Sequence, residues 1–371
     1  MTLLQEPGTA AAAVVPTSSP PPRRKRRPRK IRTFTADDWF SLVGATLASL
    51  ALVEIGYEHL LDLSGPLGFA VCWYLVFVAV YATVVSISNP RHIVVERLVT
   101  VTVWLAASVV VLALGSTIIY TFVQGWHAVV HLNFFTRDMA GVSPTAPLDK
   151  GGLLHAVAGT VIEVGIAVVV SVPLGIGTAV YMTEVGGRGS QLVRTVVESM
   201  TALPEILAGL FVYVLLIVEF GLPKSGLAVS AAMAVTMIPI IARAAEVALR
   251  VVPNGLREAS AALGANHWST VRKVVLPSAR AGLATATILA IARGIGETAI
   301  PLICSGASSF LNLNPGSEPM NSLPLYIYTA YTTHEPIAIT RGFGAAAVLL
   351  VMVLALFVVT RFLVRDRGSR R

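Results

Sequence analysis

The chain has 371 residues, of which 55% are hydrophobic and 13% are charged, and its mean hydropathy is +0.74. Soluble proteins carry about 25% charged residues, so this composition excludes an ordinary soluble globular protein. The net charge of +8 would suit a nucleic-acid-binding protein, but the basic residues gather at the ends of apolar segments, which indicates membrane topology instead.

Residues 1–37 combine an Ala/Pro/Ser/Thr-rich stretch with a basic run from Arg23 to Lys30. A segment of this composition cannot bury a core, so we expect a disordered, basic cytoplasmic tail. The basic run is too long and too late for a signal peptide, and no small-residue cleavage pattern follows it. We interpret the tail as an anchor at the anionic surface of the lipid bilayer and expect no nucleic acid partner.

Eight apolar stretches follow the tail, and each is long enough to cross a membrane as a helix. Their approximate spans are 39–60, 67–87, 97–124, 153–184, 192–219, 226–249, 279–305 and 338–363. The sequence therefore predicts an all-α integral membrane protein with about eight transmembrane helices. Three of these helices contain a proline at which we expect a kink (Pro173, Pro204 and Pro239), and Gly175 and Gly177 should allow close helix approach.

The distribution of basic residues predicts the orientation of these helices. With the N-terminus in the cytoplasm, 23 of the 28 Lys and Arg residues lie on or near the cytoplasmic side, whereas the outer loops hold Arg137, Lys150 and Lys224. By the positive-inside rule both termini are cytoplasmic. The outer segments 125–152 and 306–336 are long enough either to be plain loops or to dock an extracytoplasmic partner.

A polar stretch from Pro253 to Pro277 interrupts the apolar pattern on the cytoplasmic side. Pro253-Asn254-Gly255 ends one helix and can begin another, Gly264 ends a short helix, and a second short helix runs through Trp268. Its small-residue face, at Ala259 and Ala262 with Leu263 beside them, would fit the groove of a partner. The alternative interpretation is a solvated connector between two membrane helices.

This stretch resembles a known signature. Glu258-Ala259, Gly264 and Leu276-Pro277 resemble the EAA signature of ABC importer permeases, with Ser260 in place of the second alanine. Downstream, the segment from Ala292 to Ala299 is similar to the R-x-x-G-E-T-A motif of PstA-type permeases of the ABC phosphate importer family, although Ile300 replaces the usual proline. The resemblance covers roughly residues 100–365.

The family resemblance implies a six-helix type I importer core that matches the third to the eighth predicted helix. Residues 38–92 would then be two accessory transmembrane helices, 96–363 the permease core, and 364–371 a basic cytoplasmic tail. The coupling helix, at about 254–268, would dock in a cleft of the ATPase subunit. The residues implied in ATPase coupling are Glu258, Ala259, Ala262, Leu263, Gly264 and Pro277.

The same resemblance implies a phosphate importer in the bacterial plasma membrane that works by alternating access. Its partners would be a second, homologous PstC-like permease subunit, a PstB-like ATPase dimer and a PstS-like extracytoplasmic phosphate-binding protein. The sequence has no G-x-x-x-x-G-K-[ST] motif, so ATP and Mg²⁺ would bind the partner ATPase and this chain would bind no cofactor. We find no catalytic constellation and no metal-ligand spacing, so we do not expect an enzyme.

Two basic–acidic pairs lie inside predicted membrane helices, Arg243 with Glu246 and Arg293 with Glu297. Charges at this depth are costly and normally line a water-filled path or the interior of a bundle. Both arginines are expected near the membrane midplane, where a planar guanidinium can bind phosphate oxygens through two hydrogen bonds. We therefore predict an anion path formed by these four residues and Thr298, with helix–helix neutralisation as the structural alternative.

Three further acidic residues, Glu163, Glu198 and Glu205, lie in the fourth and fifth predicted helices, and we assign Glu205 no role beyond facing the interior. Two other functions stay open from the sequence. One is import of a different oxyanion or small solute. The other is an ion-coupled secondary transporter with the Arg/Glu pairs as a proton relay, which would need no ATPase and would leave Glu258 to Pro277 unexplained. A membrane scaffold would not need charges at the midplane.

Overall fold

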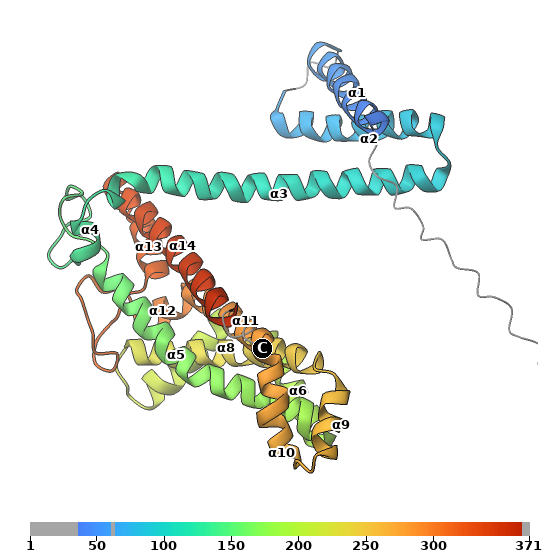
Figure 1. The fold of residues 1–371 in the computed structure, drawn as a ribbon. Helices are drawn as coiled ribbons and strands as arrows, with labels where there is room; N and C mark the ends of the chain where they lie inside the picture. The colour runs from blue at the N-terminus through green and yellow to red at the C-terminus, as the bar shows by residue number, and fades with distance from the viewer. Residues whose placement is uncertain (1–35, 61–63, 366–371) are drawn as a thin grey trace, which may run out of the picture. The chain divides into compact units, whose positions relative to one another are not determined.

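The computed structural model describes residues 36–60 and 64–365, and every regular element within these ranges is a helix (Figure 1). Most of the predicted N-terminal tail, and residues 366–371 of the predicted C-terminal tail, lie outside the described residues. The chain divides into two compact units, Met1–Val110 and Val111–Arg371.

The first unit is a helical hairpin followed by the beginning of a long helix. Its elements are α1 (Ala36–Val53), the π-helical turn η1 (Glu54–Leu60), α2 (Pro66–Ser88) and the first part of α3 (Arg91–Val129). Phe77, Tyr81 and Val85 of α2 form a small buried cluster with Ala45 of α1. Arg97 of α3 forms an ion pair with Asp38 of α1, which ties the first turn of the hairpin to the third helix.

The second unit contains all remaining elements (Figure 1). They are α4 (Asn133–Thr136), α5 (Leu154–Val180), η2 (Tyr181–Val185), α6 (Gly187–Thr201), α7 (Glu205–Val212), η3 (Tyr213–Glu219), α8 (Gly226–Arg250), α9 (Asn254–Ala262), α10 (His267–Thr270), η4 (Val271–Val275), α11 (Leu276–Ile295), α12 (Ala299–Cys304), α13 (Leu323–Thr332) and α14 (Pro336–Arg365).

Helix α8 forms the centre of the second unit, because α5 and α11 both pack against it. The contact with α5 is very close at Gly175, where an added Cβ would lie 2.7 Å from Cβ of Ile241. The predicted close approach is therefore correct at Gly175. An added Cβ at Gly177 would have no neighbour within 4 Å, so this second glycine does not serve helix packing within the chain.

Among the described residues, seven helices are long and apolar enough to cross a membrane, and the bent pair of α6 and α7 with η3 would make an eighth span. This agrees with the predicted all-α fold and the predicted number of spans. Two of the predicted spans, however, are not single helices.

The predicted helix 192–219 is wrong as a straight element. Gly187–Thr201 and Glu205–Glu219 are bent by 102° at a short break. Pro204 occupies the boundary position before α7 with ψ 134°, and a proline restrains the preceding residue from helical geometry. The expected kink at Pro204 is therefore a complete break.

The predicted helix 279–305 is also wrong at both ends. A continuous helical segment begins earlier, at His267, and runs through α10, η4 and α11 to Ile295. Pro277 lies in the first turn of α11, the position of a helix at which a missing N–H is tolerated, and the π-helical turn η4 precedes it. After Ile295 the chain leaves helical geometry over 296–298 and resumes as α12.

The two long segments that are predicted to lie outside the membrane, 125–152 and 306–336, contact each other. The Met139 amide donates to the carbonyl oxygen of Ser309 at 2.9 Å, and the Leu311 amide donates to Oδ2 of Asp138 at 2.9 Å. The segment predicted as a loop over 306–336 also contains helix α13. These segments therefore form an ordered structure over the ends of α5 and α14.

Candidate functional site

The carboxylate of Glu246, on α8, is the centre of an arginine cluster. Its side chain is 4% exposed and lies 3.2 Å from Nη1 of Arg243, as the sequence predicts. Arg194 of α6 and Arg250 of α8 each place Nη2 2.7 Å from Oε1 of the same carboxylate. A buried carboxylate is stable only with such partners, and three guanidinium groups here surround a single acid.

A second cross-helix pair continues this cluster, because Nη1 of Arg243 also lies 3.1 Å from Oε1 of Glu198 on α6. Arg194 and Glu198 are four residues apart and therefore share one face of α6. Arg194 pairs with Glu246 of α8, and Glu198 pairs with the earlier residue Arg243. Because the order of the partners is reversed, α6 and α8 run antiparallel where their charged faces meet. We call Arg194, Glu198, Arg243, Glu246 and Arg250 the α6–α8 charge ladder.

Arg293 has a different partner from the predicted one. Its Nε donates to Oε1 of Glu205, at the start of α7, at 2.6 Å. The predicted pairing with Glu297 is wrong, because it assumed an unbroken helix that would place both residues on one face. Since α11 ends at Ile295, Glu297 does not continue the face of Arg293; its Oε1 accepts the backbone N–H of Ala299 at 3.1 Å, and its carboxyl group lies against that of Glu205.

A cavity of about 80 Å³ opens at the break between α6 and α7. Glu205 and Arg293 line it together with the threonines Thr201 and Thr236, and apolar side chains from α6, α7 and α8 complete its wall. The side chains of Arg293 and Glu205 are 58% and 31% exposed, so this ion pair is accessible. Thr298 lies at the boundary of α12 and does not line this cavity.

The cavity and the charge ladder lie on one continuous face. Thr236 precedes Arg243 by seven residues on α8, and Thr201 follows Glu198 by three residues on α6, so each pair shares a helix face. The ladder, Arg293, Glu205 and Glu297 together bring four arginines and four glutamates to this region. A balanced set of fixed charges can attract an anion without holding it permanently. The depth of these groups in the membrane stays a prediction.

Helix α9 and the turn after it present the residues implied in ATPase coupling to the outside of the chain. Glu258, Ala259, Ala262, Leu263 and Gly264 are all exposed, with Leu263 89% exposed. Gly264 has φ 80°, a left-handed conformation that favours glycine and ends the helix.

The position at which the sequence departs from the EAA pattern has a structural role. Ser260 is buried, and its hydroxyl lies 2.9 Å from the hydroxyl of Thr270 on α10. Asn266 caps α10 by accepting the Ser269 amide at 2.8 Å. The two short helices are thus fixed as one helix–turn–helix unit before any partner binds.

Arg257 connects this unit to the membrane helices. Its Nη2 lies 2.8 Å from Oε1 of Glu184, and its Nε lies 3.4 Å from Oε2 of the same carboxylate at the end of η2. It also donates to the carbonyl oxygens of Val252 at 2.7 Å and Leu249 at 3.3 Å, at the end of α8. The side chain of Glu184 is only 5% exposed, so this link is buried on its acidic side.

Sequence reasoning missed the roles of Arg194, Glu205 and the Arg257–Glu184 pair. The four-residue spacing of Arg194 and Glu198 is visible as a helical pair, but no local pattern joins Arg194 to Glu246, which lies on another helix. Glu205 and Arg293 are 88 positions apart, so no local pattern could join them. Among the described residues, no group of three or more His, Cys, Asp or Glu side chains is arranged to hold a metal ion.

Residues 171–366 match the model of a protein family described as binding-protein-dependent transport system inner membrane component. The chain is 42% identical over 231 residues to the phosphate transport system permease protein PstA 1 of Mycobacterium tuberculosis (strain CDC 1551 / Oshkosh), which covers 62% of this chain and 75% of the relative. It is 33% identical over 246 residues to the phosphate transport system permease protein PstA of Haemophilus influenzae, which covers 66% of this chain and 85% of the relative.

Among solved structures, the chain is similar to the crystal structure of a bacterial alginate ABC transporter in complex with its alginate pentasaccharide-bound periplasmic protein. The TM-score is 0.51 with 14% identity, and the match covers 71% of this chain and 94% of the other. At this identity the likeness concerns the fold alone.

Proposed function

The chain belongs to the family of binding-protein-dependent transport system inner membrane components, and from this premise we propose that it is the permease subunit of an ATP-driven phosphate importer. Similar proteins named phosphate transport system permeases support phosphate as the substrate. As a multi-pass inner membrane component, the chain works with a separate ATPase and a binding protein. The specific partners proposed are a PstC-like second permease, a PstB-like ATPase dimer that carries ATP and Mg²⁺, and a PstS-like phosphate-binding protein.

The observation that carries this proposal is the cavity at the α6–α7 break, where Arg293 meets Glu205 beside two threonines. A guanidinium presents a planar fork of N–H donors that matches two phosphate oxygens, and Glu205 neutralises it when no anion is bound. The Arg243–Glu246 pair offers the same chemistry farther along the same face. In this proposal the anion moves from the first arginine to the second, with Thr298 and Glu297 shaping the break beside the path.

ATP-driven closure of the ATPase dimer would act on this path through α9. Exposed apolar side chains support docking there, since Leu263 is 89% and Trp268 63% exposed on the helix–turn–helix unit. The Arg257–Glu184 link would carry the movement into η2 and α5. Pro277 lies within the continuous helix that follows, so movement of α10 would also reach α11.

We propose that both termini are cytoplasmic in a bacterial plasma membrane. The excess of Lys and Arg on that side supports this orientation, and it places α9 where an ATPase can reach it. In the domain arrangement proposed, 38–92 are accessory helices and 96–363 form the importer core. Thr145→Cys and Pro315→Cys should react with a membrane-impermeant thiol reagent in intact cells. Reaction only after lysis at both positions would refute the orientation.

Uptake of labelled phosphate in cells that lack this gene tests the function directly. We expect phosphate uptake to be lost, to return with the wild-type gene, and to stay lost with Arg293→Gln. Uptake of labelled sulfate, measured in the same strains, is the control for substrate class. Loss of sulfate uptake with unchanged phosphate uptake would refute phosphate as the substrate and favour another oxyanion.

A further inference from the structure

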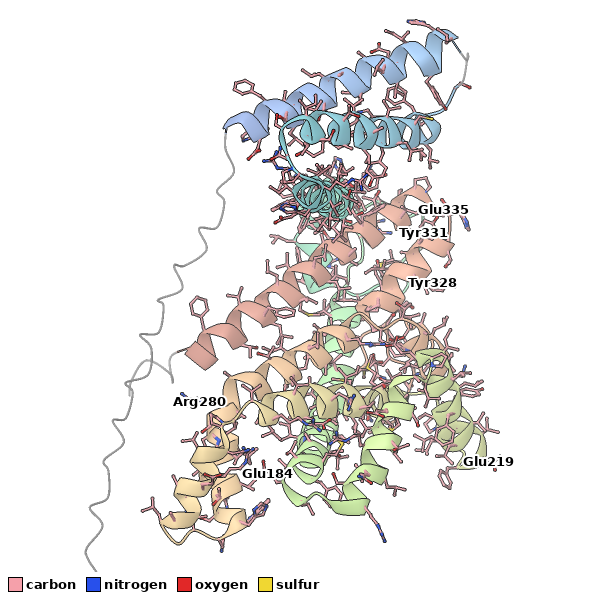
Figure 2. All side chains as sticks on the ribbon, turned by 90° about the vertical axis from the view of Figure 1, so that its right-hand side faces the viewer. Glu184, Glu219, Arg280, Tyr328, Tyr331 and Glu335 are labelled. Carbon is pink, nitrogen blue, oxygen red and sulfur yellow. The ribbon has the colours of Figure 1, made fainter. Side chains whose placement is uncertain are left out.

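Helix α5 contains a buried carboxyl group that takes no part in the proposed anion path. Glu163 is 0% exposed, and neither of its side-chain oxygens has a hydrogen-bond partner among the described residues. Buried polar groups in native proteins are nearly always hydrogen-bonded, so this acid needs an explanation. Glu219, at the end of η3, shows the ordinary arrangement, because it is exposed and projects from the surface of the chain (Figure 2).

A non-helical segment seals Glu163 from solvent. We call this segment, residues 305–322 between α12 and α13, the cover. A Cβ added at Gly226, the first residue of α8, would lie 2.8 Å from Sδ of Met320 and 3.5 Å from Cγ of Glu163, so these three residues meet at one point. The Ser305 hydroxyl fixes the cover there, because it lies 2.8 Å from the carbonyl oxygen and 2.7 Å from the amide nitrogen of Met320. Irregular segments open more readily than packed helices.

No basic side chain in the described part of the chain pairs with Glu163. Glu163 and Lys224 both act electrostatically on the Cys304 thiol of α12, so the three groups are neighbours. The thiol donates to the carbonyl oxygen of Gly209 at 3.4 Å. Lys224 is exposed, and its ammonium group lies 5.4 Å from the centre of the Tyr213 ring. Both neighbours are therefore engaged elsewhere.

The other elements around Glu163 offer no counter-charge either. The first two turns of α8, 226–233, contain no charged residue, and the charged residue of the cover, Glu318, is an exposed acid. On α5 itself, the nearest titratable residue in sequence is His155, eight positions or about 12 Å away along the helix axis. Its ring meets that of Tyr326 on α13 at 5.5 Å. Because an ionised carboxylate that is buried without a partner is very costly, Glu163 holds a proton in this structure.

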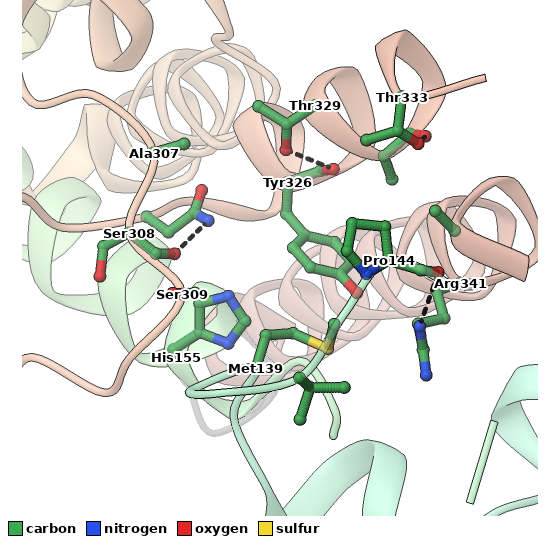
Figure 3. A pocket seen from close by; sticks show the side chains of 14 residues that line it. Met139, Pro144, His155, Ala307, Ser308, Ser309, Tyr326, Thr329, Thr333 and Arg341 are labelled. Carbon is green, nitrogen blue, oxygen red and sulfur yellow. Dashed lines mark hydrogen bonds between the residues drawn. The ribbon is translucent and has the colours of Figure 1, made fainter. Parts of the chain in front are cut away.

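The cover also forms part of the wall of a cavity of about 230 Å³. Figure 3 shows this cavity, with Ser309 of the cover and His155 of α5 on its wall. Met320 meets Glu163, and its neighbour Asn321 lines the cavity, so the cover separates the two. Both ring nitrogens of His155 and Oδ1 of Asn321 are buried without partners, and a polar cavity of this size holds water that satisfies such atoms. The exposed Thr333 also lines the cavity, which therefore opens to the surface.

We propose that Glu163 is a proton-binding site that exchanges its proton with water in this cavity when the cover separates from α5. With the cover closed, the carboxyl group keeps its O–H bond. When the cover opens, that bond breaks, the proton passes to a water molecule, and the carboxylate left behind is hydrated. A hydrated carboxylate is ionised at neutral pH, so a rise in pH favours the open form and a fall in pH favours the closed form. The site lies outside the anion path and does not depend on phosphate as the substrate.

The first test is the unfolding equilibrium of the full chain in micelles of a neutral detergent with added SDS. It is measured between about pH 6 and pH 8, above the range in which an exposed carboxyl group ionises. The folded wild type binds one proton more than the unfolded wild type, so its stability falls as the pH rises. The unfolding constant of the wild type, divided by that of Glu163→Gln, should therefore rise about tenfold per pH unit. The matched control Glu219→Gln should keep the slope of the wild type. Equal slopes for the wild type and Glu163→Gln would overturn the proposal.

Sodium tests whether a metal cation neutralises Glu163 in place of a proton. The same unfolding equilibrium is measured while sodium chloride is replaced stepwise by choline chloride at constant ionic strength. We expect the ratio of the wild type to Glu163→Gln to stay constant, because the carboxyl group carries its own proton. Stabilisation by sodium that disappears in Glu163→Gln would overturn the proton site in favour of a cation site.

A thiol on the cover tests whether its opening is linked to the proton. Met320→Cys places this thiol where the cover meets Glu163, and its labelling by N-ethylmaleimide in lipid nanodiscs is followed by mass spectrometry, which separates it from Cys72 and Cys304. The labelling rate is compared with that of the double variant Met320→Cys with Glu163→Gln, so that the ionisation of the thiol itself cancels. We expect the ratio of the two rates to rise with pH, by up to about tenfold per pH unit. A ratio that does not change with pH would overturn proton exchange through the cavity.

Discussion

Replacing Arg293 by lysine tests whether this residue binds the transported anion or only neutralises Glu205. Lysine keeps the positive charge beside the carboxylate but loses the planar fork. One hydrogen bond between charged groups contributes about 1.5–3 kcal/mol, which corresponds to a fall in uptake of about 10- to 150-fold. The cost in stability should stay below about 1 kcal/mol, because the Arg293 and Glu205 side chains are 58% and 31% exposed.

The assay is the initial rate of labelled phosphate uptake, divided by the amount of protein in the membrane. Arg188→Lys is the matched control, since Arg188 is an exposed arginine in the first turn of α6. The neutral double variant Arg293→Gln with Glu205→Gln should also be well expressed and inactive. Wild-type uptake in this double variant, or in Arg293→Lys, would leave Arg293 as a structural residue and refute the anion path at this position.

Three further predictions concern stability and coupling. Glu246→Gln leaves three guanidinium groups around a neutral side chain and should lower the free energy of unfolding by about 3–5 kcal/mol. Glu198→Gln changes a side chain that is 51% exposed and should lower it by less than about 1 kcal/mol. Equal melting temperatures of the two variants in detergent would contradict this difference. Ser260→Ala removes the buried hydrogen bond to Thr270 and should lower the free energy of unfolding by about 1 kcal/mol. Thr270→Val should lower it less in the Ser260→Ala background than in the wild type, as a double-mutant cycle of thermal unfolding would measure. Ala262→Trp should prevent co-purification of the ATPase while the permease stays in the membrane, and normal co-purification together with normal uptake would refute docking at α9.

The number and approximate positions of the membrane helices could be predicted, because each helix must satisfy its backbone within a long apolar stretch. The breaks could not be predicted from the same signal. Pro204 indicates an interruption of the helix, but the apolar composition around it does not distinguish a mild kink from the observed bend of 102°. The break at 296–298 is less visible still, since Gly296 is the only strong helix breaker in it.

The local contacts of the candidate site could be predicted from the sequence, whereas the contacts between distant residues could not. Arg243 and Glu246 lie on one uninterrupted helix, and their pairing is confirmed. The pairing of Arg293 with Glu297 was inferred from the same kind of spacing and is wrong, because the helix ends between the two residues. Glu205 reaches Arg293 only through the tertiary arrangement of α7 and α11, which no spacing in the sequence encodes.

The contacts of α8 also indicate where the protein can move. Against α5, α8 is interlocked at Gly175 and Ile241, and close-packed surfaces of this kind move as a unit. Against α6, the charge ladder is made by long side chains, four of which are 30–56% exposed, and exposed ion pairs are weak. A movement of α9 reaches α5 and α8 through Arg257, and it reaches α6 as well, because the Ser190 hydroxyl donates to the Met182 carbonyl oxygen in η2 and Val197 packs with Ala242 of α8. Of the contacts of α8, the exposed Arg243–Glu198 ion pair is therefore the one that we expect to open. In the proposed anion path, we expect Arg243 to exchange Glu198 for a passing anion; its charge would be paired before and after the exchange, so neither state would be strongly disfavoured.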